Sequence, residues 1–290
     1  MPGLREAYCT SRALLLGAGG RIEPLIHPKP GGVTRCWEFR GVSIYDFALA
    51  SIALDRALIA SCLKGCREGC MAAGFKSYLD TASRLGLRSN VNTGTLLLLL
   101  PLACTLGSAV DPGRHAREAS RCALEVAADV DAYWYYKVLE RFKPSHLGEY
   151  KGPLPPIGSG EYPRSVAEIL RGVRWDHVHR ELLKGYPLTL EAIEIMRKRG
   201  YSEEGLATTV LELIARHGDT LIGRRHGWRA VKKAMEEAVV ALKMVNATGD
   251  LAWIERLWME WRRRGWSPGS VLDVVAAALG LSYLHGLIER

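Results

Sequence analysis

The sequence predicts an all-α protein, built as a single-domain, multi-helix orthogonal bundle. Apolar residues recur at spacings of three and four over most of the chain, including residues 45–65, 115–142 and 165–185. The segments between them lack the alternation of apolar and polar residues that is typical of a strand. With 290 residues, of which 48% are hydrophobic, the chain can bury about three quarters of its unfolded surface. We therefore expect one domain, residues 1–290, around a large core.

The first break in the helical pattern is HPKPGGVTR, residues 27–35. Its prolines stiffen the backbone, while Gly31 and Gly32 permit a close backbone approach or a positive φ. Lys29 and Arg35 carry positive charges that can face a phosphate. The stretch is therefore either one wall of an anion site or an ordinary turn between helices.

The next break is SNVNTGTLLLLLPLA, residues 89–103. Asn90 or Asn92 can cap a helix whose first turn holds Gly94 and whose body is wholly apolar. Such a helix is buried all round, so its first N–H groups face the interior or a cleft, where an anion can bind them. The alternative is a helix cap without any ligand.

The longest non-helical stretch, residues 143–163, is rich in Gly and Pro. A structureless connection of this length is unusual inside a compact domain, so it is either a domain boundary or a lid. Because the composition does not change across it, we favour a loop or lid within the single domain.

A charged loop follows at residues 217–227, HGDTLIGRRHG, between two apolar helical patterns. Asp219 can bind a metal ion, and Arg224 and Arg225 can donate to phosphates. The alternative is that Asp219 caps the next helix and the arginines are solvated.

The last break is GWSPGSVLDVVAAALGL, residues 265–281. Ser267 is suited to the N-cap of a buried helix, with Pro following it at the first helical position. Gly269 leaves the helix end open to a ligand, and Asp273 lies little more than one turn further on. The stretches 27–35, 89–103, 217–227 and 265–281 can together form a polyphosphate site, in which Asp219 and Asp273 hold Mg²⁺.

The charge balance indicates an anionic partner. The chain has 39 Lys and Arg against 31 Asp and Glu, for a net charge of +8. Nucleic acid is the weaker candidate, because the positive charge is not gathered on one recognition helix. Arg supplies 28 of these residues and Lys 11, a preference that hints at a thermophilic source.

Neither the start of the chain nor its apolar runs indicate a membrane or an export signal. The first residues lack the uninterrupted apolar core of a signal peptide. The longest apolar run, residues 96–106, is shorter than the roughly 20 residues that span a bilayer. We expect a cytoplasmic protein with no membrane partner.

The seven cysteines do not form the pattern of a secreted disulfide framework. Cys62, Cys66 and Cys70, at i, i+4 and i+8, would share a helix face and can bind a metal or cluster. A buried stripe of small residues and the disulfides of hyperthermophile proteins are the alternatives. His177 and His179 stand two apart on a predicted helix and do not share a face, which argues against zinc there.

Four of these motifs occur in the order known from one enzyme family. PKPGGVTR followed by Asp46, SNVNTG, GDTLIGRRHG and SPGSVLDVVAAAL resemble the triphosphoribosyl-dephospho-coenzyme A synthase family, and most of all its archaeal branch. The likeness runs from about residue 5 to the end of the chain. In WDHVHRELLKGYP, Asp176 and Glu181 match positions that the family keeps acidic.

The resemblance implies an all-α transferase that moves the 5-triphosphoribosyl group of ATP to the ribose 2′-hydroxyl of dephospho-CoA and releases adenine. It implies Mg²⁺ with ATP as the substrate, and ATP and dephospho-CoA as partners. Glu181 or Asp46 is then the expected base. The expected phosphate and nucleotide contacts are Lys29, Gly31, Asn90, Asn92, Gly94, Arg224, Arg225, Ser267 and Gly269.

The chain departs from the family pattern at two motifs. Asn92 and Thr93 stand where bacterial members often carry His-Lys, and Trp266 and Ser267 stand where the last motif often starts with Asn. Two rival functions follow. One is the same chemistry on another nucleotide or coenzyme, for instance in archaeal pterin cofactor synthesis, and the other is non-catalytic nucleotide binding. The wholly apolar helices would also tolerate a homodimer contact.

Overall fold

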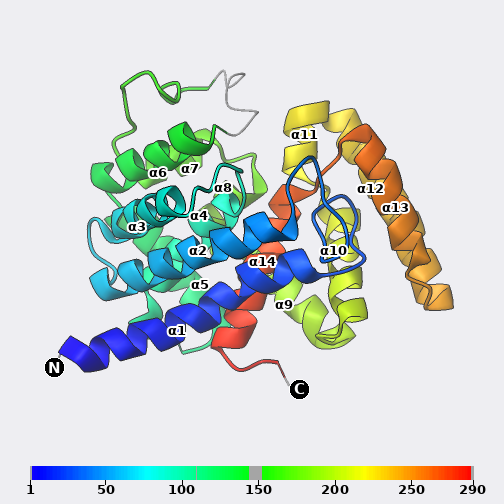
Figure 1. The fold of residues 1–290 in the computed structure, drawn as a ribbon, viewed down its shortest axis with the longest axis horizontal. Coiled ribbons are helices and arrows are strands. Elements are labelled where there is room, and N and C mark those ends of the chain that lie inside the picture. Colours follow the sequence, from blue (N-terminus) through cyan, green and yellow to red (C-terminus); the bar gives the residue numbers. More distant parts are fainter. Residues whose placement is uncertain (1, 109, 144–151, 289–290) are drawn as a thin grey trace.

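The computed structural model describes residues 2–108, 110–143 and 152–288, and in this part of the chain it contains helices and no strand (Figure 1). The α-helices are α1 (Pro2–Ile22), α2 (Ile44–Lys64), α3 (Cys70–Arg84), α4 (Thr93–Cys104), α5 (Pro112–Arg121), α6 (Asp129–Phe142), α7 (Val166–Gly172), α8 (His177–Lys184), α9 (Pro187–Arg199), α10 (Glu203–His217), α11 (Thr220–His226), α12 (Trp228–Thr248), α13 (Ala252–Arg264) and α14 (Gly269–Leu284). Two 3₁₀ turns, η1 (Glu23–Leu25) and η2 (Leu106–Ser108), and a π-helix, η3 (Cys122–Val126), complete the set. The prediction of an all-α fold is confirmed.

The two most apolar helices, α4 and α14, lie at the centre of the molecule, as expected from their composition. Helix α14 packs against α1, α4 and α9, and α1 also packs against α2 (Figure 1). One cluster of buried residues extends from Cys9 to Leu284, which supports the proposal of a single domain. No helix among the described residues is long and apolar enough to cross a membrane.

Glycines let α1 and α14 approach each other closely. A Cβ atom on Gly19 would lie 1.8 Å from the carbonyl oxygen of Ala276, and one on Gly280 would lie 2.3 Å from that of Leu16. Since both obstacles are backbone atoms, a side chain at either position would force the helices apart. The α1–α14 contact therefore depends on residues that have no side chain.

Two of the predicted long helices are broken. The segment 115–142 is interrupted by the π-helix η3 and by extended backbone at Ala127 and Ala128, after which α6 begins. The segment 165–185 is interrupted after Gly172, and Asp176 caps the new helix α8 by accepting from the N–H groups of the next helical turn. In both places a new helix begins at an acidic cap, although the apolar pattern continues. The spacing of apolar residues therefore does not reveal these helix boundaries.

The predicted loop or lid at 143–163 is only partly open to description, because residues 144–151 lie outside the described residues. From residue 152 to 163 the backbone is not helical. This part returns to α6, where Tyr136 Oη donates to the carbonyl of Pro155 at 3.1 Å and the ring of Tyr162 packs 4.8 Å from that of Tyr133. A lid function stays a prediction.

The prediction that Cys62, Cys66 and Cys70 share one helix face is wrong. Helix α2 ends at Lys64, and Cys62 forms a disulfide with Cys9 of α1. Cys66 lies beyond the helix and forms a disulfide with Cys122. The disulfide alternative therefore holds for Cys62 and Cys66.

Buried carboxylates tie several helix N-termini to other parts of the chain. Glu181 of α8 is fully buried, and its two oxygens accept from the N–H groups of Leu188 at 3.0 Å and Thr189 at 2.7 Å. These N–H groups belong to the first turn of α9 and have no partner within that helix. Burial raises the pKa of Glu181, and the hydrogen bonds from the α9 amides act against this rise. Glu181 thus holds the start of α9 in place.

Replacing Glu181 with Gln should destabilise the fold. The amide offers one acceptor oxygen for two backbone donors and turns its own N–H groups toward one of them, so we expect a loss of about 1.5–3 kcal/mol and a melting temperature lower by roughly 2–5 °C. Glu194→Gln is the matched control, because Glu194 lies on α9 with a side chain 59% exposed. Thermal unfolding followed by circular dichroism measures both. Equal melting temperatures of Glu181→Gln and the wild type would show that this carboxylate does not hold α9.

Candidate active site

A cavity of about 530 Å³ opens where the loops between the central helices meet. Its wall is formed by the loop that precedes α2, the loop that leads into α4, the first turns of α8 and α14, and α11, with α6 on one side. The positively charged residues that line it are Arg40, Lys143, Arg224 and Arg225. The carboxylates that line it are Glu23, Asp176 and Asp273.

Many of the residues predicted from the sequence come together here. From the loop into α4 the cavity wall includes Asn90, Asn92 and Gly94. From α11 and the start of α14 it includes Arg224, Arg225, Ser267, Gly269 and Asp273.

The N-terminus of α4 is capped from another helix. Asn92 occupies the N-cap position with φ +60°, but its side chain makes no capping hydrogen bond, and its buried Nδ2 has no partner. Asp273 of α14 takes this role, because its Oδ1 accepts from Thr95 N at 2.9 Å and Thr95 Oγ1 at 2.7 Å. A Cβ on Gly94 would lie 2.1 Å from Asp273 Oδ2. Glycine is therefore required at position 94 for the carboxylate to reach the helix end.

Asp273 and Glu23 form a pair of buried carboxylates at the cavity. Burial raises the pKa of Asp273 to about 7; the hydrogen bonds of Thr95 act against the rise, and the negative charge of Glu23 adds to it. Burial also raises the pKa of Glu23, although Lys29 lowers it in part. Both shifts disfavour the charged carboxylates, and a cation bound beside them would favour the charged forms.

Lys29 does not face a phosphate site. Its side chain is 1% exposed, and Nζ donates to the carboxylate of Glu23 and, at 2.7 Å, to the carbonyl of the same residue. It does not line the cavity. The prediction of a phosphate-binding lysine is corrected to a buried ion pair with a cavity carboxylate.

Three guanidinium groups, those of Arg40, Arg224 and Arg225, form what we call the arginine cluster. Burial lowers the pKa of Arg225, and the positive charges of Arg40 and Arg224 lower it further. Arg224 also lies 3.5 Å from Asp176 Oδ2 and above the ring of Trp175. An anion bound between these groups would favour all three positive charges.

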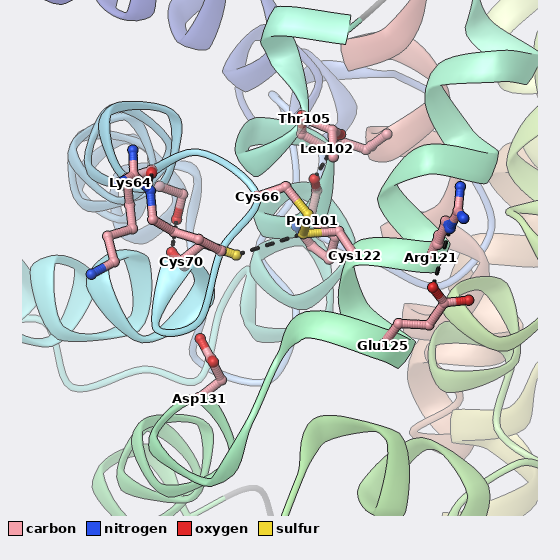
Figure 2. The surroundings of a disulfide bond; sticks show 12 residues. Lys64, Cys66, Cys70, Pro101, Leu102, Thr105, Arg121, Cys122, Glu125 and Asp131 are labelled. Carbon is pink, nitrogen blue, oxygen red and sulfur yellow. Dashed lines mark hydrogen bonds and ion pairs between the residues drawn. A yellow bond between two sulfur atoms is a disulfide. The ribbon is translucent and has the colours of Figure 1, made fainter.

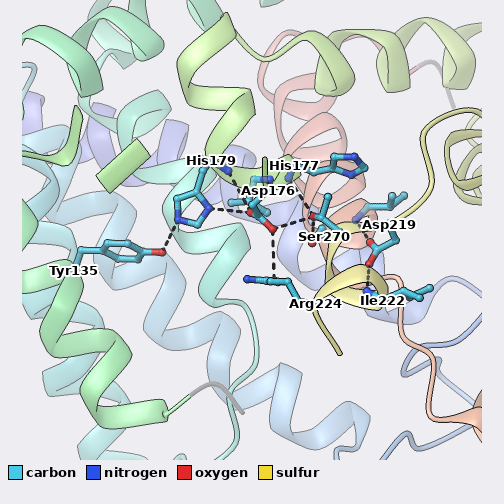
Figure 3. A network of polar contacts seen from close by, with 11 residues as sticks. Tyr135, Asp176, His177, His179, Asp219, Ile222, Arg224 and Ser270 are labelled. Carbon is cyan, nitrogen blue, oxygen red and sulfur yellow. Dashed lines mark hydrogen bonds and ion pairs between the residues drawn. The ribbon is translucent and has the colours of Figure 1, made fainter. Parts of the chain in front are cut away.

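A polar network connects this cluster to α6 (Figure 3). Asp176 Oδ1 lies 2.8 Å from His179 Nδ1, and His179 Nε2 lies 3.3 Å from the hydroxyl of Tyr135. On the other side, Thr220 Oγ1 lies 2.9 Å from both Asp176 Oδ2 and Ser270 Oγ. The network runs from the interior to the cavity, and Tyr135 and His179 form part of the cavity wall.

The charge state of Asp176 follows from its contacts. Burial alone would raise its pKa, but the hydrogen bond from His179 and the positive charge of Arg224 hold the pKa well below its ordinary value. Asp176 is therefore a carboxylate. Its Oδ1 faces Nδ1 of His179, and the other ring nitrogen, Nε2, faces Tyr135.

Asp219, expected to bind metal, is turned away from the cavity. It is fully buried, its Oδ1 accepts from Ile222 N at 2.9 Å in α11, and its Oδ2 accepts from Val271 N at 2.9 Å in α14. Burial raises its pKa to about 6, and these two hydrogen bonds oppose the rise. The prediction is corrected to a double helix cap. The N-cap role expected of Ser267 is also wrong. Pro268 stands at the N-cap position of α14, and Asp219 accepts from Val271 N in the first turn of that helix.

The remaining expected residues also lie outside the cavity wall. Asp46 caps its own helix through Ser43 N and Oγ and accepts from Ser89 Oγ at 2.9 Å. Gly31 has φ +56°, and a Cβ there would lie 2.5 Å from the carbonyl of Trp266, so it is needed for loop packing. Neither these two nor Glu181 line the cavity, and a role of Asp46 or Glu181 as the base stays a prediction.

Sequence reasoning missed several residues of the cavity. Tyr135 was hidden in an aromatic run at helical core spacing, and His179 was discounted because it stands two residues from His177. Glu23 and Arg40 lie just outside the conspicuous 27–35 motif. The Asp-x-x-His spacing of Asp176 and His179 was the available signal, since a helix cap and a residue three positions later lie side by side.

Comparisons with known proteins agree with the fold and the motifs. A family model described as ATP:dephospho-CoA triphosphoribosyl transferase matches residues 9–290. Among solved structures, the chain is similar to a crystal structure from Archaeoglobus fulgidus named as a triphosphoribosyl-dephospho-CoA synthase, with a TM-score of 0.63 and 16% sequence identity. That match covers 83% of this chain and 99% of the other and shows a shared fold. A search of curated proteins finds no significant match. Since the family model spans nearly its whole length, the chain belongs to the ATP:dephospho-CoA triphosphoribosyl transferase family.

Proposed function

We propose that the cavity is the site of triphosphoribosyl transfer, with the triphosphate of ATP at the arginine cluster and the acceptor hydroxyl of dephospho-CoA beside His179. The family activity is the transfer of the triphosphoribosyl group of ATP to dephospho-CoA. The observation that carries the placement is the presence of three guanidinium groups and a carboxylate-bound histidine on the wall of one cavity.

The arginine cluster supports a polyanion. A triphosphate spreads several negative charges over a length that Arg40, Arg224 and Arg225 can contact together, and guanidinium groups bind phosphates through paired N–H donors. Binding the anion removes the repulsion among the three cations. The unpartnered Nδ2 of Asn92 adds a neutral donor to the same cavity.

A magnesium ion would fit beside Asp273. Mg²⁺ is held by one or two carboxylates, by waters and by substrate phosphates. Thr95 occupies Oδ1 of Asp273, whereas Oδ2 lies over Gly94, where no side chain blocks it. Glu23 supplies the second carboxylate, in place of Asp219. The ion would neutralise charge on the triphosphate and relieve the two buried acids.

His179 is the proposed base. As the C1′–N9 bond of ATP breaks, positive charge builds at C1′, and the 2′-hydroxyl of the acceptor forms the new bond to C1′ while losing its proton. Nε2 of His179 accepts this proton directly or through Tyr135, and Asp176 stabilises the imidazolium that results. Adenine gains one proton on leaving, and His179 releases the proton that it took from the hydroxyl. The reaction as a whole therefore neither consumes nor produces protons.

The activity is tested by incubating the protein with Mg²⁺-ATP, with and without dephospho-CoA, and separating adenine by chromatography. We expect adenine in amounts equal to the product, and only when dephospho-CoA is present, because the acceptor must attack C1′. Equal adenine release without acceptor would indicate hydrolysis instead. Absence of adenine in both reactions, with ATP still bound, would favour a nucleotide-binding protein.

Arg225→Ala should weaken ATP binding by about 10- to 100-fold, the effect of losing a charge-assisted hydrogen bond of about 1.5–3 kcal/mol. Isothermal titration with ATP and Mg²⁺ measures this. Arg229→Ala is the matched control, since Arg229 is exposed on α12 and does not line the cavity. Equal losses in both variants would mean that net charge attracts ATP and that the arginine cluster does not hold it.

His179→Gln should lower the rate constant kcat for adenine release by about 10²- to 10⁴-fold, the usual contribution of a general base. KM for ATP should change little, because the triphosphate is bound by the arginine cluster. Tyr135→Phe keeps the ring and removes the hydroxyl, and it slows turnover only where Tyr135 carries the proton. A His179→Gln variant with wild-type kcat would remove His179 from the mechanism.

A further inference from the structure

Cysteines from α3, α4, η3 and the loop before α3 lie close together, and none of them lines the cavity; Figure 2 shows Cys66, Cys70 and Cys122. Cys70 begins α3, Cys104 ends α4 and Cys122 begins η3; all three are buried, and their sulfur atoms lie within 4.8 Å of one another. Cys66, in the exposed loop between α2 and α3, is disulfide-bonded to Cys122. We call these four residues the sulfur cluster.

The arrangement matches that of a tetrahedral metal site. Zinc binds thiolate sulfur at about 2.3 Å, and the edge of such a tetrahedron is about 3.8 Å long. The sulfur atoms of Cys70 and Cys122 are 3.8 Å apart. Cys104 lies within the same small volume, so three of the four vertices are already close to their required places.

The backbone around the sulfur cluster is fixed by other contacts. Asp131 is fully buried and accepts from Gly69 N at 3.0 Å, Ala72 N at 2.7 Å and Ala128 N at 3.0 Å. These bonds hold the loop that carries Cys66 and the first turn of α3. Cys122 opens a π-helix, a rare turn that is often found at functional sites.

We propose that the reduced protein binds one thiophilic divalent cation, with zinc as the expected ion, through Cys66, Cys70, Cys104 and Cys122. A dithiol reductant first delivers two electrons and two protons to the Cys66–Cys122 disulfide and becomes a disulfide itself. The ion then replaces the protons of four thiols, which are released to solvent. The exposed loop of Cys66 gives the reductant access.

The charges around the sulfur cluster bear on this exchange. A divalent ion with four thiolates carries a net charge of −2, and Asp131 adds a further negative charge nearby. Arg121, next to Cys122 in the chain, is paired with Glu125 at 3.1 Å (Figure 2).

The test uses Co²⁺ as an optical probe. The full-length protein is reduced with a water-soluble phosphine. Each disulfide becomes two thiols, the phosphine is oxidised to a phosphine oxide with oxygen from water, and no thiol ligand is added. We expect one cobalt ion per chain, with the visible absorption of a tetrahedral thiolate site, and loss of that absorption when zinc is added. A reduced protein with wild-type circular dichroism and no such absorption would overturn the proposal.

Two variants separate a four-sulfur site from chance binding at reduced disulfides. Cys104→Ala and Cys70→Ala leave both disulfide pairs intact and remove one sulfur ligand each, so they should weaken cobalt binding and shift its visible absorption, while circular dichroism shows that the helices remain. Cys36→Ala is the matched control, because Cys36 is an exposed thiol outside the sulfur cluster, and it should bind cobalt like the wild type. Cobalt affinity and absorption that stay unchanged in both variants would assign the binding to the reduced disulfide pairs alone and refute the proposal.

Discussion

The fold depends on acidic side chains that are buried where helices begin. Asp131, Glu181, Asp219 and Asp273 each bring a carboxylate into the interior, and each is compensated by N–H groups of a helix N-terminus. A buried charge without such partners would cost several kcal/mol, whereas the first turn of a helix supplies unpaired donors and a favourable dipole. Each buried acid is therefore stabilised by the helix N-terminus that it contacts, and the contact fixes the position of that N-terminus.

Most of these contacts connect segments that are far apart in the sequence. Asp219 joins the starts of α11 and α14, and Asp273 joins α14 to α4. Because the two acids share α14, the starts of α4, α11 and α14 are fixed relative to one another. These are the helix ends that surround the cavity, so the same contacts that stabilise the fold also shape the site.

The sequence was sufficient to predict the helices and the loops that form the cavity, because apolar helices must end in polar loops and such loops gather at helix ends. It was not sufficient to assign the acids. A helix cap, a metal ligand and a base all require a carboxylate in a polar loop, and what separates them is the partner. For Asp219 the partner amide belongs to Val271, and for Asp273 it belongs to Thr95, contacts that no local pattern encodes. His179 was missed because its contact in the cavity wall is with Tyr135, which belongs to another helix.

The distribution of charge supports the proposed position of the triphosphate within the cavity. The start of α4 carries the neutral residues Asn92 and Thr93. The amide of Thr95 at this helix end already donates to Asp273, and the adjoining carboxylates make this side of the cavity negative. The opposite charge is concentrated in Arg40, Arg224 and Arg225. A polyanion is therefore drawn to the α11 side, while a cation is drawn to the α4 side, so a magnesium ion bound to the phosphates would lie between the two and join them.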